Sequence, residues 1–322
     1  MRRNVLVQLN QVAKHFPSGL SSRQVKAVDG VSLDIFQGES LGLVGESGCG
    51  KSTLGRVILR LTDITSGQVL FQGQDVFKLR ASELAEQRKQ MQLIFQDPCA
   101  CLNPRLRIED IIAEPLKFHR KLRREQIRER VCSLMDEVGL QPDMGRRFAH
   151  GLSGGQQQRV GIARALVLQP KFLVCDEPVS ALDVSVQAQI LNLLVTLKEK
   201  RGLTYLFISH NLSVVHHLCD RIAVMYLGRI VELADKDTLF RKPLHPYTQG
   251  LMSAMLTLQK DPQRQTIELL GDIPSPMNPP AGCSFCPRCP HAQPICREEA
   301  PGLQETESGH FVACHCIPSS GR

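Results

Sequence analysis

The sequence predicts an α/β fold with a parallel β-sheet covered by helices, followed by a small cysteine-rich extension. Three observations support this prediction. Helical and strand patterns alternate from residue 160 to residue 228, which is typical of a parallel sheet. A glycine-rich turn at 45–50 joins a short apolar run to a helical pattern. Six of the 12 cysteines lie within residues 283–316.

The elements follow in order along the chain. Residues 5–75 carry strand patterns separated by Gly and Pro turns: VLVQLNQV (5–12), VSLDI (31–35), ESLGLVG (39–45) and QVLFQG (68–73). Residues 80–150 are more polar and predict an inserted helical lobe. The later elements are helix 160–168, strand 171–175, helix 185–200, strand 203–209, helix 211–218 and strand 221–228. The proline-rich tract at 271–282 marks a boundary.

Composition narrows the functional class. The 322 residues are 42% hydrophobic with a net charge of +7. The densest basic run, 120–130, alternates with Glu and predicts a solvated helix face, so we expect no nucleic-acid partner. No apolar run reaches the roughly 18 residues of a membrane span, and the N-terminal segment is a poor signal peptide. We expect a cytoplasmic protein with structural, reduced cysteines in its first 220 residues: Cys49, Cys99, Cys101, Cys132, Cys175 and Cys219.

The segment GESGCGKST (45–53) fits the phosphate-loop pattern and lies between a predicted strand and a predicted helix. Gly45, Gly48 and Gly50 let backbone N–H groups surround phosphates. Lys51 offers a point charge to the β- and γ-phosphates, and Ser52 offers a hydroxyl to Mg²⁺. The segment therefore predicts a nucleotide-binding site.

The segment FLVCDEP (172–178) is a buried strand that ends in two carboxylates. In such a sheet, ligands bind at the carboxyl ends of the strands. Asp176 is placed to hold Mg²⁺ through water, and Glu177 to polarise an attacking water. The alternative is a simple acidic turn.

The segment LSGGQQQR (152–159) is ambiguous alone. Ser153 can cap a helix, and Gly154 and Gly155 leave backbone N–H groups open to an anion. An ordinary capped helix without a ligand is the alternative interpretation of the same residues.

Six motifs together resolve the ambiguity. GESGCGKST, the Gln of LIFQDP, LSGGQQQR, CDEP, SALD and the His of FISH occur in the order and spacing of ATP-binding cassette proteins. The chain resembles these motor subunits of ABC transporters over roughly residues 5–240. The resemblance implies a P-loop NTPase cassette with a parallel-sheet core, an antiparallel β subdomain and a helical lobe at about 97–160. It also implies a second domain at 241–322.

The resemblance also implies roles for single residues. Gln96 would sense Mg²⁺ and the attacking water, Asp183 would communicate across a dimer, and His210 would contact the γ-phosphate and orient Glu177. Asn211 replaces the usual Asp, with no large effect expected. The residues expected to bind ATP are Phe16, Gly45, Glu46, Ser47, Gly48, Cys49, Gly50, Lys51, Ser52, Thr53, Ser153, Gly154, Gly155 and Asp183, and those expected to bind Mg²⁺ are Ser52, Gln96 and Asp176.

Two of these assignments have particular consequences. Ser153, Gly154 and Gly155 would face the γ-phosphate of a second cassette, so that two ATP molecules are sandwiched in a head-to-tail dimer. Phe16 would stack on adenine, although a core Phe is the alternative reading of the same position.

Further segments are similar to ATPase subunits of dipeptide and oligopeptide importers, most like the second of the two ATPases in such systems. They include DPCACLNPR (97–105), PLHPYTQGLMSA (243–254) and GDIPSPMNPPAGC (271–283). Importers of nickel, glutathione and other small cargo share these segments, so the cargo stays open. A soluble, non-transport cassette ATPase is the other alternative, but such proteins usually carry two cassettes or a long coiled-coil insertion.

The implied partners are a second ABC ATPase subunit, either identical or different, two membrane permease subunits and an external solute-binding protein. The implied location is peripheral, at the cytoplasmic face of the inner membrane. We expect a permease to dock on residues 97–112, which directly follow Gln96, through Leu102 and Arg105.

The C-terminal cysteines predict a metal site, but their spacing fits zinc and an iron–sulfur cluster equally. The resemblance implies a [4Fe–4S] cluster on Cys283, Cys289, Cys296 and Cys314. Zinc, free thiols or a disulfide remain alternatives, and Cys286 and Cys316 are additional. Loss of the cluster should loosen the tail, while ATP binding by residues 1–240 survives.

Overall fold

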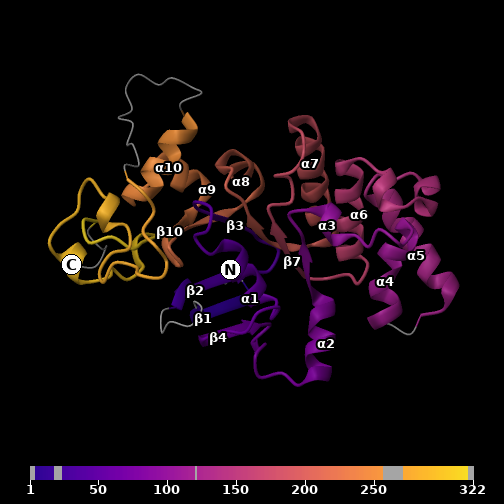
Figure 1. Ribbon diagram of the computed structural model, residues 1–322, viewed down its shortest axis with the longest axis horizontal. Helices are drawn as coiled ribbons and strands as arrows, with labels where there is room; N and C mark the ends of the chain where they lie inside the picture. The colour runs from indigo at the N-terminus through magenta and orange to yellow at the C-terminus, as the bar shows by residue number, and fades with distance from the viewer. Residues whose placement is uncertain (1–3, 18–23, 120–121, 257–270, 318–322) are drawn as a thin grey trace. The chain divides into compact units, whose positions relative to one another are not determined.

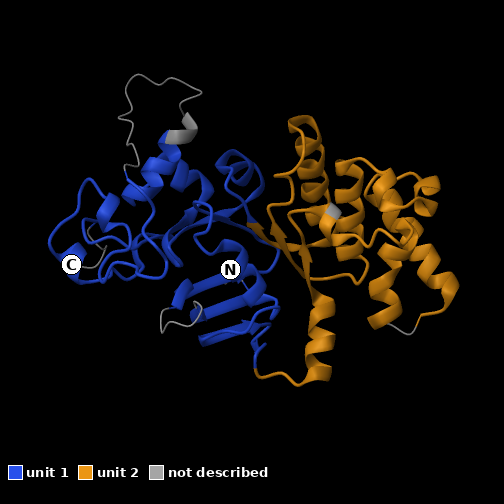
Figure 2. Cartoon of the chain, in the orientation of Figure 1, with its two compact units in different colours: residues 1–77, 208–322 blue, residues 78–207 orange. Residues whose placement is uncertain are grey.

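The computed structural model describes residues 4–17, 24–119, 122–256 and 271–317 (Figure 1). The chain divides into two compact units (Figure 2). Unit 1 comprises Met1–Phe77 and Ile208–Arg322, and unit 2 comprises Lys78–Phe207. The C-terminal region belongs to the same compact unit as the N-terminal strands. The domain boundary expected at residue 240 stays a prediction.

Unit 1 contains an antiparallel sheet with the strand order β2-β1-β4-β5. Strands β1 (Val5–Pro17) and β2 (Gln24–Phe36) form a long hairpin, and β1 also pairs with β4 (Ser66–Phe71), which turns into β5 (Gln74–Asp75). This is the antiparallel β subdomain that the sequence resemblance implied.

The second sheet of unit 1 is mixed. Strand β3 (Ser40–Val44) pairs in parallel with β9 (Arg221–Tyr226), which pairs antiparallel with β10 (Arg229–Asp235). The C-terminal strands β11 (Gln304–Glu307) and β12 (His310–Val312) extend it beside β10. All five residues of β3 are buried, as expected for a strand covered on both faces. The helices of unit 1 are α1 (Lys51–Ile58), α8 (Leu212–Leu218), α9 (Lys236–Arg241), α10 (Pro246–Leu256), α11 (Ile295–Glu298) and the 3₁₀ helix η3 (Cys286–Arg288).

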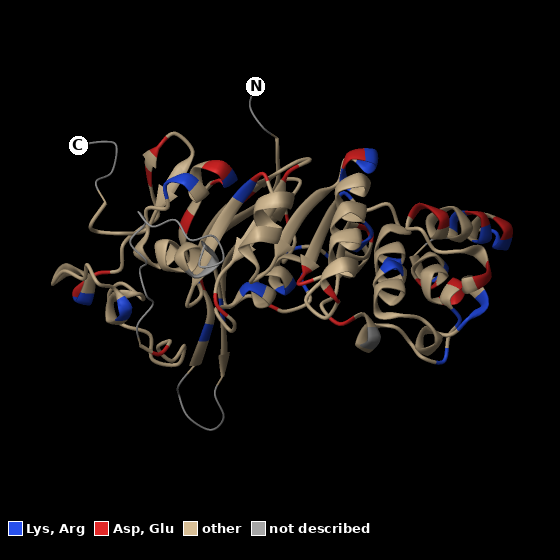
Figure 3. Ribbon diagram, turned by 90° about the horizontal axis from the view of Figure 1, so that it is seen from above, with Lys and Arg blue, Asp and Glu red and all other residues tan. Residues whose placement is uncertain are grey.

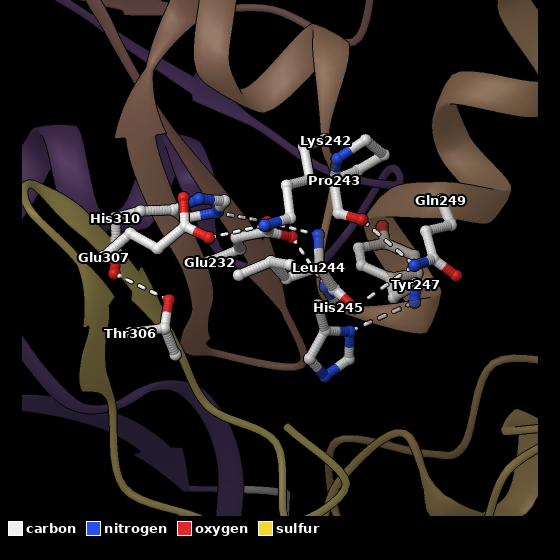
Figure 4. A network of polar contacts seen from close by, with 10 residues as sticks. All are labelled: Glu232, Lys242, Pro243, Leu244, His245, Tyr247, Gln249, Thr306, Glu307 and His310. Carbon is white, nitrogen blue, oxygen red and sulfur yellow. Dashed lines mark hydrogen bonds and ion pairs between the residues drawn. The ribbon is translucent and has the colours of Figure 1, made fainter. Parts of the chain in front are cut away.

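A buried carboxylate joins the C-terminal region to this sheet (Figure 4). Glu232 of β10 accepts hydrogen bonds from the backbone N–H groups of Leu244 and His245, at 2.7 and 2.9 Å. The ring of His310, on β12, lies 2.7 Å from the same carboxylate. Glu232 is fully buried, so these partners compensate for the loss of water around its charge.

Unit 2 carries the strands β6 (Met91–Ile94), β7 (Phe172–Asp176) and β8 (Thr204–Ile208), in the order β8-β7-β6, with β6 and β7 parallel. Its helices are α2 (Ala81–Gln90), α3 (Pro98–Cys101), α4 (Ile108–His119), α5 (Arg124–Glu137), α6 (Gly154–Leu166) and α7 (Val184–Arg201), with the 3₁₀ helices η1 (Pro142–Arg146) and η2 (Ala149–Gly151). The predicted helical lobe and the alternating helices and strands are therefore present.

Two sequence expectations about the surface can be compared with the structure. Acidic and basic residues are interspersed on the helices of unit 2 (Figure 3), and most of 122–130 is exposed, in agreement with a solvated face for that run; residues 120 and 121 lie outside the described part. Within the described ranges, no helix has the length and apolar character needed to cross a membrane.

Candidate functional site

The glycine-rich loop follows the buried strand β3 and leads directly into helix α1. Gly45 and Gly50 have positive φ angles of 156° and 109°. A Cβ at Gly45 would lie 2.2 Å from the carbonyl oxygen of Met225, and one at Gly50 would lie 1.9 Å from that of Ala27. Both positions therefore need glycine, because neighbouring backbone approaches too closely for any side chain.

Lys51 is the only side-chain cation in the loop, and it is 5% exposed. Its Nζ donates hydrogen bonds to the carbonyl oxygens of Gly45 (2.8 Å) and Glu46 (2.9 Å). The first backbone N–H groups of α1 have no partner within the helix and carry its positive dipole end. The loop thus combines a placed ammonium group with a helix N-terminus, which is an arrangement suited to phosphate.

The remaining loop residues differ in accessibility. Ser47 and Gly48 are exposed, Ser52 and Thr53 are half-buried on the first turn of α1, and Cys49 is buried. Burial raises the pKa of the Cys49 thiol. Cys49 therefore packs inside the loop, while its neighbours remain accessible to a ligand.

Glu46 has two contacts that the sequence did not predict. Its backbone N–H donates to the hydroxyl of Tyr247 at 2.9 Å. Its carboxylate accepts two hydrogen bonds from the Arg288 guanidinium, at 2.8 and 3.2 Å, and this pairing raises the pKa of Arg288. Tyr247 and Arg288 belong to the C-terminal region, 201 and 242 residues away in sequence, and no local pattern indicates such distant pairing.

The candidate catalytic carboxylate lies in unit 2, at the end of the wholly buried strand β7. Glu177 has a φ of 45°, which a non-glycine residue adopts only when the surroundings hold it there. Gln96 donates to the Glu177 carboxylate at 3.0 Å, and Ser180 donates to the Glu177 carbonyl from both its N–H and its hydroxyl. Asp176, one residue earlier, is 6% exposed. The structure therefore brings Gln96 and Glu177 together; the roles expected for them with Mg²⁺ and the attacking water stay predictions.

The LSGGQ segment begins helix α6 with a capping box. The Ser153 hydroxyl accepts from the Gln156 N–H, and the Gln156 side chain accepts from the Ser153 N–H. This cap starts the helix at Gly154, directly after the residue expected to cap it. Ser153 and Gly154 are exposed, whereas a Cβ at Gly155 would lie 2.5 Å from Val186. Only the first part of the segment is accessible to a partner.

The other candidates occupy distinct positions. His210 and Asp183 are exposed. The side chain of Asn211 accepts the N–H groups of Ser213 and Val214 and caps α8; an Asp there would do the same, which agrees with the small effect expected from this departure.

Phe16 is 37% exposed, with the Lys14 ammonium 4.7 Å above its ring. It is not a core residue, so the core alternative is wrong. Stacking on adenine remains a prediction.

One sequence expectation needs correction. Leu102 is 2% exposed, so its side chain packs inside unit 2 and cannot form a docking surface. Arg105 is exposed. A hydrogen bond holds the segment that follows Gln96 against helix α6: the Arg164 guanidinium donates to the Cys101 carbonyl oxygen at 2.6 Å.

The C-terminal cysteines lie near one another without forming a ligand set. Cys296 is buried, and Cys283, Cys289 and Cys314 are half-buried. Burial, reinforced by neighbouring thiols, raises the pKa of Cys314 to about 12. In the part of the chain that the structure describes, no group of three or more His, Cys, Asp or Glu residues is arranged to hold a metal ion. The described geometry does not itself fit an iron–sulfur cluster or zinc.

Comparisons with known proteins show the family of the chain. Residues 28–180 match the family described as ABC transporter, and residues 231–296 match the oligopeptide/dipeptide transporter C-terminal region. The oligopeptide transport ATP-binding protein AppF of Bacillus subtilis is 51% identical over 321 residues, covering 97% of this chain and 98% of AppF. The chain belongs to the ABC transporter ATPases. OppF of Salmonella typhimurium, an oligopeptide transport ATP-binding protein, is 50% identical over 323 residues, covering 97% of this chain and 96% of OppF.

Solved structures confirm the cassette fold. The dimeric ATP-binding cassette MJ0796, bound to ADP and Pi in a post-hydrolysis state, has a TM-score of 0.66 and 30% identity, covering 72% of this chain and 99% of MJ0796. The cbiO1 protein of Clostridium perfringens, part of the cbiONQ ABC transporter complex, has the same TM-score with 25% identity, covering 80% of this chain and 96% of cbiO1. The predicted family, fold and ATPase class are confirmed.

Proposed function

We propose that this chain is the ATP-hydrolysing subunit of a membrane importer and energises uptake of dipeptides or oligopeptides. The observation that carries the ATPase assignment is the Gln96–Glu177 contact at the end of the buried strand β7. The peptide assignment is supported by the C-terminal region, which matches the oligopeptide/dipeptide transporter family. Nickel and glutathione are the alternative cargoes, because importers of these share the same sequence segments.

In the proposed reaction, each placed group has one task. Lys51 leaves its two carbonyl partners to stabilise the β- and γ-phosphates, and the N–H groups at the start of α1 bind phosphate oxygens. The Ser52 hydroxyl and the Asp176 carboxylate would hold Mg²⁺, which neutralises phosphate charge. Glu177 polarises the attacking water while Gln96 orients the carboxylate. His210 contacts the γ-phosphate.

The Ser153–Gly155 segment serves a second cassette in this proposal. Support comes from exposure, since Ser153 and Gly154 have only a local cap and present accessible backbone. Asp183 is exposed near the start of α7 and would communicate across the dimer. The second cassette is another copy of this chain or a related ATPase subunit.

The membrane partners are two permease subunits, supplied with substrate by an external binding protein, so the chain would work at the cytoplasmic face of the cell membrane. We place the permease contact around Arg105, in the segment that follows Gln96. The Arg164–Cys101 hydrogen bond ties this segment to the helix that begins at the LSGGQ motif. A docking surface and a nucleotide-contacting motif would then move as one element, which coupling requires.

A cluster on Cys283, Cys289, Cys296 and Cys314 is a further proposal, with zinc as its alternative. Its support is the gathering of these thiols in one small region, where the N–H of Cys283 bonds to the carbonyl of Cys296 at 2.8 Å. Ligation requires rearrangement of the thiols. Iron and zinc analysis of protein prepared without oxygen tests it: about four iron atoms per chain support the cluster, and stoichiometric zinc or no metal contradicts it.

Reconstitution tests the main proposal. The chain, its partner ATPase and the two permeases are placed in vesicles, with the binding protein supplied outside. We expect ATP-dependent accumulation of labelled di- or oligopeptides, and phosphate release that the loaded binding protein stimulates. Accumulation of nickel or glutathione in place of peptides would contradict the cargo, and ATP hydrolysis without any uptake would contradict the importer.

A further inference from the structure

Two side chains of the C-terminal region form hydrogen bonds with Glu46 of the phosphate loop. Three groups of this residue are engaged: its N–H by Tyr247, its carboxylate by Arg288, and its carbonyl by Lys51. The Lys51 ammonium group therefore rests on a carbonyl whose own residue is fixed by two side chains from far along the chain.

Arg288 is held rigidly for this contact. It lies in η3, between Cys286 and Cys289, and its side chain is 5% exposed. The neighbouring Phe285 is 1% exposed and packs against Tyr226 and Tyr247, with ring centroids 5.3 and 5.5 Å apart. Because Tyr247 also binds the Glu46 N–H, one aromatic cluster positions both residues that engage Glu46.

The Arg288 contact also has an electrostatic consequence. A carboxylate in a phosphate loop repels the phosphates that the loop binds, and the repulsion is stronger where water is partly excluded. Arg288 forms two hydrogen bonds with this carboxylate, the geometry in which arginine pairs most strongly. The guanidinium neutralises the Glu46 carboxylate and fixes its orientation.

We propose that Arg288 is a positioning residue for ATP binding: it orients and neutralises Glu46, so that the cysteine-rich C-terminal region sets the ATP affinity of the phosphate loop. This rests on the proposed ATP site. It also changes the sequence expectation that ATP binding survives when the cysteine region is loosened, because Arg288 lies between two of those cysteines.

The test is a titration of the full chain with a fluorescent ATP analogue. We expect Arg288→Ala to raise the dissociation constant about tenfold, as for loss of a charge-assisted contact, and Arg288→Lys to raise it less. In the assembled transporter, the KM for ATP should rise in parallel while kcat stays within about twofold, since chemistry at Glu177 is untouched.

A double-mutant cycle separates positioning from general stability. Glu46→Gln removes the charge that Arg288 neutralises, so Arg288→Ala in the Glu46→Gln background should cost markedly less affinity than Arg288→Ala alone. The matched control is Lys242→Ala, which breaks the exposed Lys242–Glu307 pair in the same region and should leave ATP affinity unchanged.

The outcomes are distinguishable. Wild-type affinity in Arg288→Ala, or an equal loss in the Glu46→Gln background, overturns the proposal. If Arg288→Ala does not fold, Arg288→Lys and Glu46→Gln carry the cycle. Lys51→Ala is titrated alongside: if it binds ATP like the wild type, the nucleotide site itself is wrong, whereas a defect in Lys51→Ala alone rejects only the role of Arg288.

Discussion

The phosphate loop and the LSGGQ segment are both glycine-rich entrances to helices, yet their surroundings differ. The loop at 45–50 is enclosed by its own unit: Lys51 is buried, Gly45 and Gly50 touch neighbouring backbone, and Glu46 has partners from the C-terminal region. Ser153 and Gly154 are exposed, and the Ser153 cap comes from Gln156 of the same helix. The phosphate loop is therefore held by long-range contacts, whereas the LSGGQ segment is held by a local cap, which fits its proposed role at a partner's nucleotide.

The largest effect on ATP hydrolysis is expected at Glu177, which belongs to neither of the two glycine-rich segments. Glu177→Gln should lower phosphate release by the assembled complex about 10³-fold, because the amide keeps the shape but cannot accept a proton. ATP binding should persist, as measured with a fluorescent analogue. Turnover near the wild-type rate would place the catalytic base elsewhere.

The stability of the folded chain should also depend on pH through His245, which lies in the C-terminal region of unit 1. Burial lowers the pKa of this ring to about 4, against a partial opposing effect of Glu232, and its Nδ1 accepts the Tyr247 N–H. Between pH 6.5 and 4 the unfolded chain binds a proton that the folded chain does not. The free energy of unfolding should therefore fall as pH drops through this window, by up to about 3 kcal/mol, and the contribution is fully present above it.

Urea unfolding of the wild type and of His245→Asn measures this effect. Asparagine retains an acceptor near Nδ1 without the ability to gain a charge, so the variant should show a flatter dependence on pH in that window. Equal slopes in both proteins would mean that His245 does not report on the attachment of the C-terminal region.

Lys51→Ala tests the phosphate loop, the more enclosed of the two glycine-rich segments. The substitution removes the only side-chain charge that the loop offers to phosphate, so the dissociation constant for ATP should rise about a hundredfold. Equilibrium titration of the isolated chain measures it. Lys242→Ala, which breaks the exposed Lys242–Glu307 pair outside the loop, provides the control and should bind ATP normally.

Gly154→Asp tests the LSGGQ segment, the more exposed of the two. The new Cβ would lie 3.2 Å from Cδ2 of Leu182, a tight contact that the Leu182 side chain must relieve by a small shift. The new carboxylate would meet a partner's γ-phosphate with like charge. ATP binding by the isolated chain should be unaffected, and the closed dimer formed in the Glu177→Gln background should fall at least about tenfold. Normal dimer formation, followed by light scattering, would exclude the sandwich for this protein.

The sequence predicts those parts of the candidate site whose functional groups lie in one short, continuous motif. GESGCGKST carries the glycines that neighbouring backbone demands and the lysine that lies on the loop. CDEP supplies the carboxylates at the end of a buried strand: Asp176 is its last residue and Glu177 directly follows it. The sequence singled out Gln96 and Glu177 separately, and the structure adds the direct hydrogen bond between them across 81 positions.

The sequence misplaced features that depend on which face a residue presents. Leu102 lies in a motif expected to dock a permease, yet its apolar side chain is buried because packing of the lobe takes precedence over exposure. For α6, the apolar periodicity that predicted a helix at 160–168 covers only its later part, while the Ser153 cap, also expected, marks its actual start.

By itself, the sequence determined the cassette fold, the two nucleotide motifs and the importer branch, because each is encoded in short stretches with a fixed local geometry. Only the tertiary structure decided that the C-terminal region belongs to the phosphate-loop unit. Arg288 and Glu46 are 242 residues apart, and Glu232 joins His245 to His310 through a buried carboxylate. Contacts of this kind depend on the order of the strands and on which side chains are buried against one another. Neither the periodicity of the sequence nor the spacing of its motifs reveals that arrangement.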